Sequence, residues 1–229
     1  MTEYKPLNSR AYEHLRGMIY NSELEFNKIY SETKLASQLA VSRTPIRDAL
    51  NRLAQERYID ILPNRGFVLH SPTQADIVEG FHVRMMMEGY CAAIVARDYP
   101  AAKARAVIDS MEDALGQQQR LLDDDSVYSL SRFWQDDLHF HRALLEYMGI
   151  SALLMQYDRI MYTFMPHHLI RRQYGGRAEP QVLERHRSTL VEHSAITEAL
   201  KGRDSARVEA AIRAHLDSSM QALYERMEQ

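Results

Sequence analysis

The stretch KLASQLAVSRTPIRDALNRL, from Lys34 to Leu53, decides the fold of the N-terminal part of the chain. Its first half has apolar residues at helical spacing, and Ser31 just before it is a favourable N-cap, so a short helix is predicted there. In its second half, Thr44 is expected to cap another helix with Pro45 in the first turn, where a missing N–H costs nothing. The inward stripe of this helix is formed by Ile46, Leu50 and Leu53. Two such helices joined by a tight turn are typical of a helix-turn-helix.

The residues on either side of this stretch complete a winged form of that motif. Upstream, apolar residues at helical spacing predict a first helix over about residues 8–21. Downstream, residues 58–62 and 67–69 are rich in β-branched and aromatic side chains, and a turn-forming Pro-Asn-Arg-Gly separates them. The sequence therefore predicts a mainly α fold that begins with a winged helix-turn-helix of three helices and a two-stranded wing, over residues 1–71.

A basic face distinguishes the second helix of this motif. Arg43 and Thr44 stand at its start, and Arg47 lies one turn further along, opposite the apolar stripe, so we expect Arg47 to contact base edges in the major groove. The wing and the preceding helix offer further contacts to phosphates or to the minor groove. The predicted DNA-binding residues are Thr33, Lys34, Arg43, Thr44, Arg47, Arg65 and Gly66. Each of these arginines alone could equally be a solvated surface charge.

Charge and composition agree with a two-domain DNA-binding protein. The net charge is −3, but residues 1–70 hold ten Lys or Arg against eight Asp or Glu, while residues 71–229 hold eighteen against twenty-three. No apolar run reaches the roughly 18 residues of a membrane span, and the N-terminus does not resemble a signal peptide. A single cysteine, Cys91, fits a reducing compartment, so we expect a cytoplasmic protein without a membrane partner.

The remainder, residues 72–229, is predicted as an all-helical bundle of about six helices. A helical pattern continues from Thr73 almost to the C-terminus. Turn-forming residues interrupt it near residues 99–100, 123–126, 149–151, 174–180 and 202–204.

Four residues of this bundle have the spacing of a metal site. Asp137 and His141 are four residues apart and share one helical face. His193 and His215 lie on the last two helices at similar distances from the turn near Gly202, so they can face each other. Three imidazoles and one carboxylate suit Zn²⁺ or Ni²⁺, with Mn²⁺ or another divalent ion as alternatives. A surface pair is the alternative for Asp137 and His141 taken alone.

The stretch from Lys34 to Leu53 resembles the signature of the GntR family of bacterial regulators. The resemblance implies that the residues matching Arg43, Thr44, Arg47 and Gly66 contact DNA. Two departures affect loop geometry: residues 26–28 replace the usual Pro-Gly before the second helix, and Arg57-Tyr58 replaces the usual Gly-Leu after the third.

The second domain, from about Thr73, is similar to the FadR C-terminal domain called FCD, and its helix number favours the six-helix, VanR-like subgroup. Metal-binding members carry Asp-x-x-x-His and two later histidines, which Asp137, His141, His193 and His215 match. Arg84 and Glu88 match an Arg-x-x-x-Glu pattern of these domains. An inward Arg84 would bind an effector carboxylate bidentately, and the alternative is an intrahelical salt bridge between the two residues.

These features together predict a homodimeric repressor whose affinity for double-stranded operator DNA depends on a small organic acid bound at or near a divalent metal ion. Two alternatives stay open on the sequence. A metal-dependent hydrolase would use the same ligands to activate water. A pure metal sensor would respond to the ion without any acid.

Overall fold

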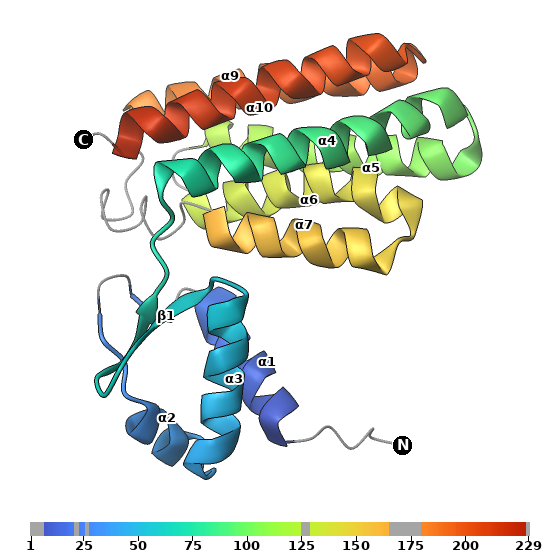
Figure 1. Cartoon of the computed structure of the whole chain (residues 1–229). Coiled ribbons are helices and arrows are strands. Elements are labelled where there is room, and N and C mark those ends of the chain that lie inside the picture. Colours follow the sequence, from blue (N-terminus) through green and yellow to red (C-terminus); the bar gives the residue numbers. More distant parts are fainter. Residues whose placement is uncertain (1–6, 21–22, 26–27, 125–128, 165–179, 228–229) are drawn as a thin grey trace. The chain divides into compact units, whose positions relative to one another are not determined.

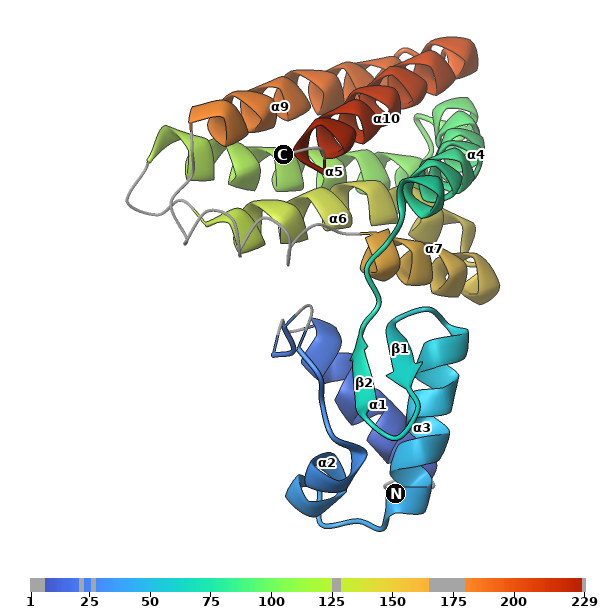
Figure 2. The same cartoon turned by 60° about the vertical axis from the view of Figure 1, so that its left-hand side comes forward.

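The computed structural model describes residues 7–20, 23–25, 28–124, 129–164 and 180–227. The chain divides into two compact units between Pro72 and Thr73, one residue from the predicted boundary. Within the described residues there are nine helices and one antiparallel pair of strands (Figures 1 and 2). The predicted mainly α fold class is confirmed. No helix of this part of the chain is long and apolar enough to cross a membrane.

The first unit is a winged helix-turn-helix. Its elements are α1 (Leu7–Tyr20), α2 (Glu32–Gln38), α3 (Arg43–Gln55), β1 (Ile59–Leu62) and β2 (Gly66–Leu69). Helix α3 packs against α1, α2 and β1, and the predicted inward stripe of α3 is fully buried. In the wing, Ile59 pairs with Leu69 and Leu62 pairs with Gly66. A short bridge between Tyr30 and Phe67 ties the segment before α2 to the wing.

Two local features of α3 differ from the sequence-based expectation. The N-cap is Ser42, not Thr44, because Ser42 has the extended backbone of a cap and the helix already begins at Arg43. Pro45 still lies in the first turn, where it costs no hydrogen bond. At the other end, Arg57 has a positive φ of 60°, so the departure from the usual glycine places a side chain in the left-handed conformation that glycine favours.

The second unit is a bundle in which α4 is central. Its described helices are α4 (Gln74–Asp98), α5 (Ala102–Asp123), α6 (Leu130–Met148), α7 (Ser151–Phe164), α9 (Pro180–Lys201) and α10 (Ser205–Met227). Helix α4 packs against the other five, and α9 and α10 lie side by side as an antiparallel pair (Figure 1). Thr73 and Asp76 form a capping box that starts α4, which explains why the helical pattern begins there.

The helices of the bundle end where turn-forming residues were expected. Gly149 adopts the left-handed conformation at the end of α6, and Arg203 does so in the turn between α9 and α10. The expected interruption at residues 174–180 lies outside the described residues except for Pro180, which begins α9.

The core of the bundle is largely apolar, but it also buries an unusual group of charged and polar side chains. Among them are Arg84, Glu88, His141, His193 and His215, from four different helices. Burying ionisable groups is costly unless they are paired or bind an ion, so this group marks the candidate site.

Candidate functional site

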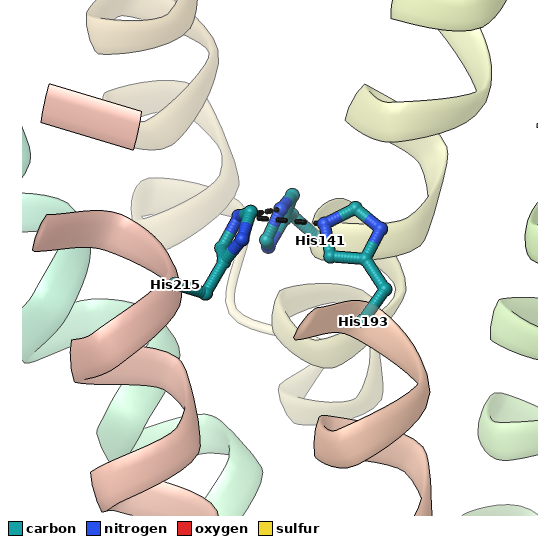
Figure 3. Close-up of side chains that lie close together, drawn as sticks. All are labelled: His141, His193 and His215. Carbon is teal, nitrogen blue, oxygen red and sulfur yellow. Dashed lines mark hydrogen bonds between the residues drawn. The ribbon is translucent and has the colours of Figure 1, made fainter. Parts of the chain in front are cut away.

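Three imidazoles converge in the core of the bundle. His141 comes from α6, His193 from α9 and His215 from α10, and one ring nitrogen of each lies within 4.8 Å of those of the other two (Figure 3). The Nε2 atom of His215 lies 3.1 Å from that of His141 and 3.3 Å from that of His193. The hairpin of α9 and α10 therefore brings its two histidines to the same height, as their distances from the turn had predicted.

Asp137 lies at the edge of the histidine trio, which is formed by His141, His193 and His215. It is one turn before His141 on α6, and its Oδ1 is 3.5 Å from the Nε2 of His193. Its side chain is 15% exposed, whereas those of His141 and His193 are fully buried. The structure thus brings all four predicted ligands together, with the three imidazoles inside and the carboxylate on the rim.

Two carboxylates contact the trio from outside, and each lies close to the Nδ1 atom of one histidine. Glu88 Oε2 lies 2.8 Å from Nδ1 of His141, and Glu192 Oε2 lies 2.8 Å from Nδ1 of His215. The contact of Glu192 with His215 has the geometry of a hydrogen bond, and an ionised carboxylate can only accept, so Nδ1 of His215 carries the proton and its Nε2 presents a lone pair to the centre. The contact of Glu88 with His141 is an ion-pair distance without hydrogen-bond geometry. The third imidazole, His193, is held instead by stacking on Phe140, with ring centroids 4.0 Å apart.

Electrostatics favour the neutral forms of His193 and His215 and the ionised forms of the two carboxylates. Burial and then the neighbouring imidazoles lower the pKa of His193 well below its ordinary value, and burial also lowers the pKa of His215 although Glu192 opposes this. Burial alone would raise the pKa of Glu88, but the charge of Arg84 and then the approach of the His141 ring lower it to about 2. Neutral imidazoles backed by ionised carboxylates are good metal ligands.

Arg84 lies inside the bundle next to this site. Its Nε donates to Glu88 Oε1 at 2.7 Å, so the predicted inward orientation and the alternative salt bridge are both present. Its Nη2 atom is buried and has no hydrogen-bond partner among the described residues. A buried guanidinium N–H without an acceptor is unfavourable, so this atom points to a place for an anionic oxygen.

The predicted DNA-binding residues all belong to the first unit and lie near its surface. Thr33, Lys34, Arg43, Thr44, Arg47 and Arg65 are exposed, and Gly66 is partly buried. Arg43 and Arg47 are each 60% exposed, and both approach the same carboxylate oxygen of Glu32, at 3.8 and 3.5 Å. Sequence reasoning did not identify Glu32, because its contact with α3 depends on how α2 packs.

Gly66, predicted to contact DNA, also has a structural role within the unit. It is the first residue of β2, with a positive φ of 117°, and a Cβ atom there would overlap the carbonyl of Tyr30. The glycine is therefore required for the bridge between Tyr30 and Phe67 within the unit. Arg65, which precedes it, occupies the exposed turn of the wing.

Comparison with known proteins agrees with this architecture. Residues 7–69 match the family model of bacterial regulatory proteins, gntR family, and residues 79–218 match that of the FCD domain. The chain belongs to the GntR family and carries an FCD domain. GntR-type helix-turn-helix proteins bind operator DNA, so this GntR-family protein is a transcription regulator and not an enzyme, and the hydrolase alternative is wrong.

One relative and one solved structure match almost the whole chain, and a second relative matches about two thirds of it. The chain is 28% identical over 219 residues to the HTH-type transcriptional repressor RspR of Escherichia coli (strain K12), covering 93% of this chain and 86% of that protein. It is 30% identical over 147 residues to the gluconate operon transcriptional repressor of Bacillus licheniformis, covering 64% and 57% of the two chains. The structure of E. coli McbR/YncC has the same fold, with a TM-score of 0.73, 15% identity and coverage of 98% and 100%.

Two residues that contact the histidines of the candidate site were not predicted from the sequence. Glu192 was not predicted, although it precedes His193, because it contacts His215 on the neighbouring helix. Phe140 likewise precedes His141 but stacks on His193. Neither pattern has a spacing signal, since both contacts join different helices.

Proposed function

We propose that this regulator is a repressor whose affinity for operator DNA is set by a small organic acid bound beside a divalent metal ion in the FCD domain. The observation that carries the proposal is the convergence of three buried Nε2 atoms, from His141, His193 and His215, next to a guanidinium N–H without a partner among the described residues. Repression is supported by two relatives that are transcriptional repressors, RspR of E. coli and the gluconate operon repressor of B. licheniformis.

The donor set fits a divalent metal ion. Two nitrogens bound to one tetrahedral ion at 2.0–2.1 Å lie about 3.3 Å apart, which is close to the 3.1 and 3.3 Å separations of the Nε2 atoms. Imidazole nitrogens at these separations either share a proton as N–H···N or, when each presents a lone pair, repel unless a cation lies among them. The three histidines would hold the ion, with Asp137 as the fourth ligand, and Zn²⁺ or Ni²⁺ suits this set better than Mn²⁺.

Arg84 is the residue that we assign to the acid. A bound ion would supply a positive charge that attracts one carboxylate oxygen, and Arg84 Nη2 is available to donate to another. This atom favours an acid-responsive regulator over a pure metal sensor, which would have no need of a buried N–H without an acceptor. Arg84 also keeps its charge, because Glu88 raises its pKa even though burial opposes this.

Binding DNA as a homodimer is part of the proposal. Helix α4 exposes two large apolar side chains one turn apart, with Met86 66% and Tyr90 63% exposed. Exposed apolar patches of this kind are common at protein interfaces. In a dimer with two recognition helices, an acid can change operator affinity only by its different affinity for the two arrangements of the dimer.

A thermal unfolding experiment tests the metal and the acid together. The full chain is treated with a chelator, and its unfolding midpoint is measured after adding Zn²⁺, Ni²⁺ or Mn²⁺, alone and with a panel of small carboxylic acids. An ion at a hundred times its dissociation constant stabilises the fold by about 2.7 kcal/mol, which raises the midpoint by roughly 5–10 °C. We expect a further rise with an acid only when the ion is present.

Matched variants make the result specific. His193→Ala should abolish the metal-dependent shift, whereas His139→Ala, which removes an exposed histidine from α6, should keep it. A shift with metal and none with any acid would favour the pure metal sensor. If neither the ions nor the acids move the midpoint of the wild-type protein, the proposal is wrong and the imidazoles have a structural role.

A further inference from the structure

Glu88 is a bridging carboxylate in the centre of the FCD domain. Its Oε1 accepts from Nε of Arg84 at 2.7 Å, and its Oε2 lies 2.8 Å from Nδ1 of His141. Its side chain is fully buried, so solvent does not screen either contact. One carboxylate therefore contacts both the residue assigned to the acid and a residue assigned to the metal ion.

The second carboxylate behind the trio, Glu192, has a different environment. Arg185 binds it bidentately at 2.8 and 3.0 Å, and Ser218 donates to it at 2.9 Å. The same guanidinium also donates to Ser219. Both oxygens of Glu192 and both terminal nitrogens of Arg185 therefore have partners. The Nη2 atom of Arg84, in contrast, is buried and has no hydrogen-bond partner among the described residues. Of the two carboxylates, Glu88 alone lies between the trio and an arginine that can take up another anion.

We propose that Glu88 is the positioning residue through which a carboxylate bound at Arg84 changes the affinity of the histidine trio for a divalent metal ion. This inference rests on the proposed function. An anion at Nη2 shares the charge of Arg84, so Arg84 attracts Glu88 less. The charge of Glu88, 2.8 Å from the ring of His141, then acts more strongly on this imidazole, and Nε2 of His141 becomes a better donor to the ion.

The coupling must be reciprocal. If a carboxylate tightens metal binding by a given factor, the ion tightens binding of the carboxylate by the same factor. A carboxylate that simply coordinated the ion would also give coupling, but that coupling would not depend on Glu88. The two routes are therefore separated by removing the charge of Glu88 and leaving the metal ligands in place.

The experiment uses Co²⁺ as the metal probe and acetate as the carboxylate probe on the chelator-treated full chain. The visible absorbance of protein-bound Co²⁺ is titrated in acetate and in chloride of equal ionic strength. We expect the wild-type protein to bind Co²⁺ several-fold more tightly in acetate. Glu88→Gln should bind Co²⁺ about 10–100-fold more weakly in chloride and show no acetate effect.

Glu192→Gln is the matched control, because it also removes a carboxylate from behind one imidazole. It should weaken Co²⁺ binding by a similar factor but keep the acetate effect. Arg84→Lys keeps the positive charge beside Glu88 and removes Nη2, so it should bind Co²⁺ nearly normally and lose the acetate effect. This variant also tests the proposal if Glu88→Gln does not fold, which the fluorescence of Trp134 would report.

The possible outcomes separate this inference from the proposed function. An acetate effect that survives in Glu88→Gln and Arg84→Lys, or a wild-type protein that binds Co²⁺ without responding to acetate, overturns the role of Glu88 and leaves the metal site standing. A wild-type protein that gives no bound-Co²⁺ spectrum overturns the metal site itself. If Glu192→Gln also loses the acetate effect, the effect does not depend specifically on Glu88, and the inference is wrong.

Discussion

At the scale of single residues, Glu32 is the acidic side chain that approaches the two arginines predicted to read DNA. Its carboxylate is only 19% exposed and lies within 3.8 Å of both Arg43 and Arg47. Exposed ion pairs contribute little to stability, so the main effect of Glu32 is on the arginines and on approaching phosphates. We expect it to orient the two side chains and to repel DNA that does not offer them better partners.

We therefore expect Glu32→Gln to increase affinity for random duplex DNA more than for the operator. The ratio of the two affinities should fall several-fold, because non-specific binding depends mainly on phosphate charge. Fluorescence anisotropy with an operator selected from random sequences, at several salt concentrations, measures both affinities. Arg47→Ala is the comparison and should weaken operator binding selectively. Equal changes for both DNAs in Glu32→Gln would contradict the prediction.

At the scale of elements, α6, α9 and α10 each bury one imidazole where an apolar side chain would ordinarily pack. Because the pKa values of His193 and His215 are lowered in the folded state, the unfolded chain binds more protons below about pH 6.5. The free energy of unfolding of the metal-free protein should then decrease as the pH is lowered below that value. The loss can reach about 1.4 kcal/mol per pH unit for each histidine.

Urea unfolding of the chelator-treated protein, measured between about pH 7.5 and about pH 5.5, tests this dependence. Trp134, the only tryptophan of the sequence, lies on α6 and reports on the bundle. Glu88 and Glu192 stay ionised in this range, because their pKa values are about 2. His193→Ala should reduce the slope and His139→Ala should not. An unfolding free energy that is constant or rises toward low pH would be incompatible with buried neutral imidazoles.

At the scale of the whole molecule, two DNA-reading heads bind an operator far better than one, because the second head binds at a high effective concentration. If Met86 and Tyr90 form part of the dimer interface, Tyr90→Glu places a charge in it and should produce monomers with strongly reduced operator affinity. Light scattering after size exclusion measures the mass, and anisotropy measures DNA binding. Val191→Glu, at a residue of α9 that is 71% exposed, is the control. A dimeric Tyr90→Glu protein would place the interface elsewhere.

Local patterns in the sequence determined where most helices and both strands of this protein begin and end. The inward stripe Ile46, Leu50 and Leu53 predicted α3, because helical periodicity and burial are coupled wherever one face packs on a core. The wing followed from its turn residues, and the ends of most helices of the bundle followed from the interruptions between them. The hairpin of α9 and α10 even placed His193 opposite His215, because helix rise per residue is constant.

The tertiary structure decided what these patterns could not. The contact of Glu192 with His215, the stacking of Phe140 on His193 and the approach of Glu32 to Arg47 all join different helices. Such contacts depend on the rotation and offset of packed helices, which many side chains set together and no single spacing encodes. The same holds for Glu88, whose place between Arg84 and His141 exists only because α4 runs through the centre of the bundle.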